Sequence, residues 1–281
     1  TKRYFNSAKL AAVATMISLV AALTFAQSHN NHAAMADRSN RSEPETNNLS
    51  AAPAFAGEPV TVGNGQARSW VKVDGEGKPT AVGLTFSEAA LSGLPQRLTP
   101  GLIWTEYIVS LPSDAPRLPF DHIGLNWNPR GHDPEGVYKV PHFDFHFYMI
   151  STDERDKITT RGEDKARCSK PLPEEFTPAG YIYAPDSEEP GMGSHWVEPG
   201  SHEFHGAAFT HTFIYGSYDG KVIFLEPMVA KSFLDTKPNV TAEIKLPAKY
   251  QKPGYYPTRY SVNYNPQTKE YTVALEGLTL R

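Results

Sequence analysis

The chain contains a single cysteine, Cys168, among its 281 residues. One thiol excludes an intramolecular disulfide, and it excludes a metal site built from several thiolates. Cys168 lies in ARCSKPLP, among charged and turn-forming residues, and nothing in that stretch lowers the pKa of the thiol, so a catalytic cysteine is not expected. Stability must therefore come from a hydrophobic core or from a metal held by other ligands.

Several catalytic and ligand-binding motifs are also missing. The sequence has no glycine-rich phosphate loop, no dinucleotide-binding fingerprint, no HExxH, no CxxC and no GxSxG. Helical periodicity is scarce, and no internal repeat, heptad pattern or second membrane span is visible. The chain is nevertheless 40% hydrophobic, 11% aromatic and 21% charged, which is typical of a folded globular protein.

The N-terminal residues are typical of an export signal. Lys2, Arg3 and Lys9 precede an uncharged apolar run that ends at Ala26, which predicts a signal peptide over residues 1–26. An uncleaved anchor is the alternative, and the shortness of the run speaks against it. Cleavage would change the net charge from −4 to −7, so nucleic acid is not an expected partner. We expect a periplasmic or extracellular protein with no membrane span once the signal is removed.

Residues 27–56 are rich in Asn, Ser, Ala and Glu and poor in large apolar residues, which predicts a flexible polar linker. Residues 57–281 then show short β-branched and aromatic runs between turn signals such as Asn64-Gly65 and Asp74-Gly75. The pattern predicts strands over residues 69–73, 80–86, 104–111, 123–127, 137–150 and 181–183, a hairpin that turns at 217–220, and a last one that turns at 265–266. We expect one mainly β domain (β-rich α+β), an antiparallel sandwich or barrel with a few short helices.

The stretch PHFDFHFY, residues 141–148, alternates polar and aromatic residues. Because side chains alternate between the faces of a strand, His142, Asp144, His146 and Tyr148 share one face and the phenylalanines share the other. The aromatic face belongs to the core. The polar face either meets solvent, as in many antiparallel sheets, or forms a site.

Further candidate ligands surround this strand in the sequence. Seven of the ten histidines lie between His132 and His211, and Glu226 ends the apolar run VIFLE. A carboxylate in such a run is paired, binds a ligand or lies at a sheet edge. The residues that rank highest as metal ligands are His142, His146 and His195, and Glu226 and Asp144 come next. His132, Glu135 and His211 rank behind them, and we expect His202 and His205 to be exposed.

Strand geometry limits how many of these residues share one ion. Residues at i and i+2 are roughly 7 Å apart and those at i and i+4 roughly 13 Å apart, so His142 and His146 would both have to lean inward. Alternatively, two histidines bind the ion while Asp144 orients one of them or acts as a base. Asp144 and Glu135 are the candidate catalytic bases. His and carboxylate ligands suit zinc first, and also Fe, Mn, Ni or Cu.

Three segments carry a resemblance to a known family: GHDPEGVYKVPHFDFHFYMI, GMGSHW and FIYGSYDGKVIFLEPMV. Together they resemble an uncharacterised, mostly extracytoplasmic bacterial family represented by a Thermus protein under the control of an extracytoplasmic sigma factor. The resemblance covers roughly residues 100–235. It implies export and a homo-oligomer, and it implies no reaction, because the function of that family is unknown.

Two hypotheses follow. The first is an extracytoplasmic metal-dependent hydrolase or lyase that acts on a small molecule through three protein ligands and an open coordination position. The second is a non-catalytic oligomeric binding or structural protein, whose histidines hold a structural metal, bind a ligand or make buried hydrogen bonds. A closed site with four protein ligands would favour the second.

Overall fold

The structure is a computed structural model that describes residues 55–98 and 103–281. The predicted signal peptide and nearly all of the predicted linker fall outside the described residues. The described residues belong to one compact unit. Its described strands make two seven-stranded antiparallel sheets and one two-stranded sheet.

Sheet A has the order β1-β3-β4-β15-β14-β12, and β2 also pairs with β3. Its strands are β1 (Phe55–Ala56), β2 (Val60–Val62), β3 (Gly65–Val73), β4 (Pro79–Ser87), β12 (Asn239–Glu243), β14 (Arg259–Asn265) and β15 (Glu270–Glu276). A separate pair joins β13 (Tyr255–Tyr256) and β16 (Thr279–Leu280).

Sheet B has the order β5-β6-β7-β11-β10-β9-β8. Its strands are β5 (Thr105–Ser110), β6 (His122–Asn128), β7 (His142–Tyr148), β8 (Ile182–Tyr183), β9 (Ser194–Val197), β10 (His211–Tyr218) and β11 (Lys221–Ala230). Short helices connect the strands: η1 (Glu88–Leu91), α2 (Thr152–Arg155), α3 (Asp164–Cys168), η2 (Glu174–Phe176), η3 (His202–His205) and α4 (Lys231–Leu234).

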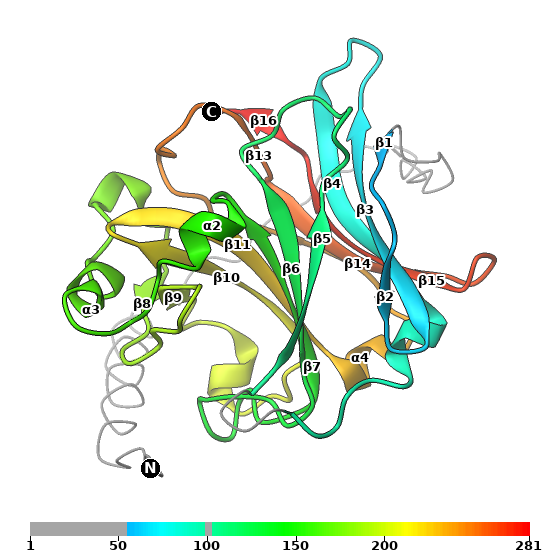
Figure 1. The fold of residues 1–281 in the computed structure, drawn as a ribbon, viewed down its shortest axis with the longest axis horizontal. Helices are drawn as coiled ribbons and strands as arrows, with labels where there is room; N and C mark the ends of the chain where they lie inside the picture. The colour runs from blue at the N-terminus through cyan, green and yellow to red at the C-terminus, as the bar shows by residue number, and fades with distance from the viewer. Residues whose placement is uncertain (1–54, 99–102) are drawn as a thin grey trace, which may run out of the picture. The chain divides into compact units, whose positions relative to one another are not determined.

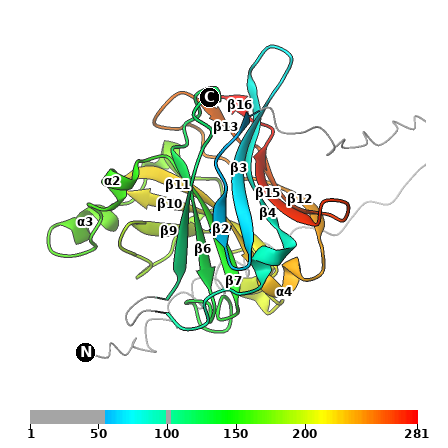
Figure 2. The ribbon, with the colours of Figure 1, turned by 45° about the vertical axis from the view of Figure 1, so that its right-hand side comes forward.

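The main core lies between the two sheets, as Figures 1 and 2 show from two directions. Phe86 of β4 in sheet A contacts Phe143 and Phe145 of β7 in sheet B, with ring centroids 6.2 and 5.9 Å apart. The aromatic half of the alternation in β7 is therefore core. The predicted mainly β, sandwich-like fold with a few short helices is confirmed.

Local sequence explains most of the strand ends. The β10–β11 hairpin turns through Asp219 and Gly220, both with positive φ, as a two-residue hairpin turn requires. A capping box between Ser151 and Glu154 opens α2. The strand predicted over residues 137–150 is shorter than expected and begins at His142, because the preceding residues fold back on themselves, with the amide of His132 donating to the carbonyl of Tyr138.

The face of sheet B that points away from sheet A is also covered. Every residue of β6 and β7 is buried, so the polar face of β7 does not meet solvent. Figures 1 and 2 show α2 and α3 on this side of sheet B. Two small apolar clusters contain residues of this face, one around Tyr148 and Phe224 and the other around Tyr138 and Met228.

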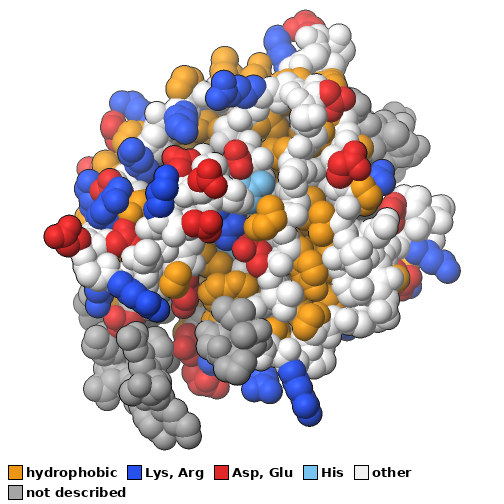
Figure 3. All heavy atoms as spheres, viewed as in Figure 1, with side chains coloured by type: hydrophobic (Ala, Val, Ile, Leu, Met, Phe, Trp, Pro, Cys, Tyr) orange, Lys and Arg blue, Asp and Glu red, His pale blue; other side chains and the backbone are white. Residues whose placement is uncertain are grey.

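Figure 3 shows several acidic side chains near the middle of the face viewed in Figure 1, with basic side chains among them and toward the edges. Across the described ranges, no helix is long and apolar enough to cross a membrane.

Candidate metal centre

Two groups of potential metal ligands lie on the outer face of sheet B. His146, His195 and Glu226, here called triad I, offer ligand atoms within 4.8 Å of one another. His132, His142 and Asp144, here called triad II, do the same. The histidine and carboxylate ligands expected from the sequence therefore come together, but in two groups instead of one.

Triad I is assembled from three strands. His146 lies on β7, Glu226 on the neighbouring β11 and His195 on β9. Nε2 of His146 is 3.4 Å from Oε1 of Glu226. Two ligands of a tetrahedral ion with bonds of 2.0–2.2 Å lie about 3.3–3.6 Å apart, so this pair has the separation that a shared ion requires.

Gly216 lies on β10, between β11, which carries Glu226, and β9, which carries His195. It pairs with His195 of β9 on one side and with Phe224 of β11 on the other. A Cβ at Gly216 would lie 2.0 Å from the ring of Phe224, so the ring occupies the space that a side chain would take. The ring of Phe224 also contacts both histidines of triad I, with centroids 4.9 Å from His146 and 5.5 Å from His195.

His195 is held in the tautomer that a metal ligand needs. Its Nδ1 donates to the carbonyl of Ser187 at 2.7 Å, and its backbone amide donates to Oγ of the same serine. Nδ1 therefore carries the proton, and Nε2 keeps the lone pair that a metal can bind. Metal-binding histidines are commonly oriented by this kind of hydrogen bond.

Burial keeps triad I uncharged. It lowers the pKa of His146 to about 3 and that of His195 to about 4, and it raises the pKa of Glu226 well above its usual value, with help from the charge of Asp144. Both imidazoles are therefore neutral at pH 7, the form that binds metal. Oε2 of Glu226 and Nδ1 of His146 are buried and have no hydrogen-bond partner among the described residues.

Triad II lies beside it, further along the same face. Asp144 and His142 precede His146 on β7, and His132 comes from the loop before that strand. Nε2 of His142 is 3.2 Å from Oδ1 of Asp144, and Nε2 of His132 is 3.7 Å from Oδ2. Asn128 on β6 donates from Nδ2 to the same Oδ2 at 2.7 Å.

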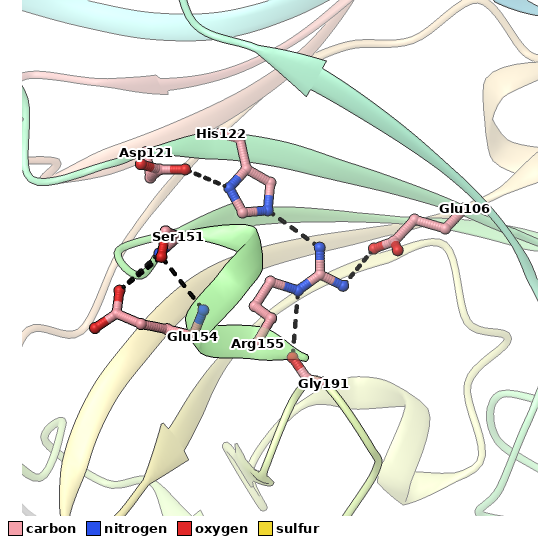
Figure 4. Close-up of polar contacts among 7 residues, drawn as sticks. All are labelled: Glu106, Asp121, His122, Ser151, Glu154, Arg155 and Gly191. Atoms are coloured by element: carbon pink, nitrogen blue, oxygen red, sulfur yellow. Dashed lines mark hydrogen bonds and ion pairs between the residues drawn. The ribbon is translucent and has the colours of Figure 1, made fainter. Parts of the chain in front are cut away.

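An arginine fixes the covering segments to the sheet (Figure 4). Arg155, at the end of α2, donates to Glu106 at 2.6 Å, to Nε2 of His122 at 3.1 Å and to the carbonyl of Gly191 at 3.3 Å. Its guanidinium also lies 3.9 Å from the ring centroid of Tyr148. Tyr148 in turn stacks on His146 of triad I, which links this anchor to the candidate site.

The remaining candidates from the sequence lie elsewhere. The carboxylate of Glu135 is exposed and lies 4.0 Å from the ammonium of Lys139, and it belongs to neither triad. His211 hydrogen-bonds the hydroxyl of Tyr260, and His202 and His205 are exposed as expected. Burial raises the pKa of Cys168 to about 11, which agrees with an unreactive thiol.

Two buried polar residues of β6, Asn126 and Asn128, were not among the candidates predicted from the sequence. Asn126 and Asn128 pair with Asp144 and His142 across the β6–β7 ladder, and both are buried. Neither Nδ2 nor Oδ1 of Asn126 has a hydrogen-bond partner within the described part of the chain. The signal was present in the sequence, because GLNWN alternates in the same way as HFDFH.

Residues 74–127 match a family model described as TTHB210-like: Hypothetical protein TTHB210. The resemblance to this family is therefore confirmed. The matched segment runs from the β3–β4 turn to β6 and includes Asn126, but it contains neither triad and none of the three segments that carry the resemblance in the sequence. Neither a curated protein nor a solved structure matches the chain.

Proposed function

We propose that this chain is an exported metal-binding protein in which triad I holds a divalent transition metal, zinc first among the candidates. The observation that carries the proposal is the meeting of two imidazoles and a carboxylate from three strands on a buried face, with ligand atoms within 4.8 Å. The tautomer of His195 and the 3.4 Å separation of His146 and Glu226 support it. Export rests on the signal predicted over residues 1–26.

A hydrolytic or lyase role on a small molecule fits this ligand set best. Three protein ligands leave a coordination position open for water or substrate, as catalytic sites do, whereas structural zinc sites are closed by four. An ion at such a site lowers the pKa of a bound water and polarises a carbonyl or phosphoryl oxygen. His195 is only partly buried, so triad I approaches solvent on that side.

The metal is tested by elemental analysis of the full chain purified without a polyhistidine tag. A His195→Gln/Glu226→Gln variant is compared with the wild type and with a His202→Gln/His205→Gln control that changes exposed histidines outside both triads. We expect the control to retain the wild-type metal content and the triad I variant to lose one equivalent per chain. Equal metal content in all three folded proteins would contradict the proposal.

The reaction class is tested separately on the metal-loaded chain. Chromogenic carboxylic and phosphate esters serve as probes of metal-dependent hydrolysis. Turnover that disappears in the triad I variant and survives in the exposed-histidine control supports a hydrolase. A loaded protein that turns over neither probe would leave the metal proposal standing and remove the support for ester hydrolysis.

A further inference from the structure

We propose that triad II binds a second divalent transition metal ion, so that the outer face of sheet B carries two ions side by side. This extends the proposed function, but it rests on contacts that triad I does not share. The donor set is the same, two imidazoles and one carboxylate. The separations of 3.2 and 3.7 Å from the two histidines to Asp144 lie close to those of ligands on one tetrahedral ion.

Both histidines of triad II are preset for metal binding. Nδ1 of His142 donates to the carbonyl of Val140 at 2.7 Å, and Nδ1 of His132 donates to the carbonyl of Asp133 at 2.7 Å. A carbonyl only accepts, so each Nδ1 carries the proton and each Nε2 is turned toward Asp144. Three backbone carbonyls, one for each of His132, His142 and His195, thus orient the imidazoles of the two triads in the same way.

No direct hydrogen bond joins either histidine of triad II to Asp144 in the described residues. Nε2 of His142 and Oδ1 of Asp144 are both buried and 3.2 Å apart, yet neither has a hydrogen-bond partner among the residues the structure describes. Nε2 of His132 is 3.7 Å from Oδ2, beyond hydrogen-bond range. A divalent cation between these two lone pairs and the buried carboxylate would satisfy all three groups at once.

The loop that carries His132 is built to return over β7. Gly131 has a φ of +64°, which favours glycine, and a Cβ there would lie 2.0 Å from the carbonyl of Tyr138. The tight turn places the ring of His132 against that of His142, with centroids 4.6 Å apart. Side chains of triad II are buried except for that of His132, which is 25% exposed and gives an ion its route in.

The two proposed ions would lie close together, because each has a ligand on the same face of β7. Asp144 of triad II and His146 of triad I are two residues apart on one face, which corresponds to roughly 7 Å along the strand. This assignment makes Asp144 a metal ligand and not a general base. With two ions, His142 and His146 each bind a different ion, so the two side chains do not have to lean toward each other.

The test is a Zn²⁺ titration of the metal-stripped full chain by calorimetry, with Co²⁺ absorption spectra as a second readout. Four proteins are compared: wild type, the triad I variant His195→Gln/Glu226→Gln, the triad II variant His132→Gln/His142→Gln, and the combined variant. We expect two equivalents of bound Zn²⁺ per chain for the wild type, one for each of the two triad variants, and none for the combined variant. The single variant His132→Gln, at a partly exposed position that is least costly to folding, should weaken one of the two binding events at least tenfold.

Other stoichiometries separate the two proposals. One equivalent in the wild type that the triad II changes leave intact would overturn the second site and keep the first. If the wild type binds one equivalent and each double variant loses it, the two triads share a single ion, and the proposal of a second site is overturned. One equivalent lost only with the triad II changes would support triad II and overturn triad I.

Discussion

At the scale of single residues, the candidate site depends on small details of the strands. Gly216 is the clearest case, because its missing side chain makes room for the Phe224 ring that both histidines of triad I contact. The geometry of the ligands therefore depends on a residue that binds nothing.

Gly216→Ala should displace the ring of Phe224 and disturb triad I. We expect a loss of about 1–3 kcal/mol in the free energy of unfolding, the usual cost of overpacking, together with weaker binding of one metal ion. Urea denaturation and Zn²⁺ titration measure the two effects. Gly75→Ala is the control, since a Cβ at Gly75 meets nothing within 4 Å. Similar results for the two variants would refute this role of Gly216.

Asn128 should act on triad II through the carboxylate that it orients. Asn128→Ala removes the 2.7 Å hydrogen bond to Oδ2 of Asp144 but leaves all three ligands in place. Loss of such an orienting contact typically weakens metal binding 10- to 100-fold. We expect that drop for one of the two Zn²⁺ binding events. Unchanged affinities at both sites would show that Asp144 needs no such support.

At the scale of elements, the covering segments are tied to sheet B by Arg155. This one side chain joins α2, β5, β6 and the loop at Gly191. The loop leads into β9, which carries His195, so the anchor helps to position triad I from outside.

Arg155→Met should loosen this cover. Removing one partner of a largely buried ion pair leaves Glu106 uncompensated, and we expect a loss of about 3 kcal/mol in the free energy of unfolding. Hydrogen exchange should quicken in residues 151–158 and 187–195. Lys249→Met, which breaks an exposed pair with Glu175, should cost less than about 1 kcal/mol. Equal losses for the two variants would argue against the anchoring role.

His122 makes the same anchor sensitive to acid. Its Nδ1 donates to Asp121 while its Nε2 accepts from Arg155, so the ring must be neutral. Burial and the charge of Arg155 lower the pKa of His122, against the opposing effect of Asp121. Because the folded pKa lies below the unfolded value near 6.5, the stabilisation is present above pH 6.5 and is lost as the pH falls.

The free energy of unfolding of the metal-stripped chain should therefore fall between pH 7 and pH 5. His122 contributes at most about 1.4 kcal/mol per pH unit to this fall. Denaturation with urea at a series of pH values should give a shallower dependence for His122→Gln than for the wild type. An identical slope in the two proteins would show that His122 does not take part.

At the scale of the whole molecule, the sequence predicted the class of fold, and it indicated which residues share the polar face of β7, but it did not indicate how the candidate ligands are grouped. Alternation in HFDFHFY placed His142, Asp144 and His146 on one face, and the apolar run before Glu226 marked a buried carboxylate. The pairing of β7 with β11 and the two-strand reach of His195 depend on sheet order, which local pattern does not encode. The position of His132 could not be predicted either. It depends on how the loop of residues 131–140 folds back over β7, and the alternation within the strand says nothing about that loop.

Short strands were the least predictable elements of the fold. Two-residue strands such as β1 and β16 lack room for an alternation to appear, and the ends of β12 are set by pairing with β14. Burial of the polar face could not be read from the sequence either. That burial comes from α2, α3 and loops that fold back over β7, and their placement depends on tertiary contacts that a local pattern does not encode.

Metal binding should stabilise the compact unit as a whole, because an ion that binds only the folded state shifts the unfolding equilibrium. Free Zn²⁺ at 100 times its Kd adds about 2.7 kcal/mol per site. For a unit of this size that corresponds to a rise of roughly 5–10 °C in Tm. Thermal unfolding after treatment with a chelator should show the reverse shift. A combined variant of both triads that responds to Zn²⁺ as the wild type does would place the binding elsewhere.

Metal binding at the two triads can be seen directly in a crystal structure of the Zn²⁺-loaded chain, with anomalous diffraction recorded on both sides of the zinc absorption edge. We expect an anomalous peak enclosed by His146, His195 and Glu226, with bonds of about 2.0–2.2 Å, and a second enclosed by His132, His142 and Asp144. Peaks confined to exposed side chains such as His202 and His205, with none on the outer face of sheet B, would contradict this expectation.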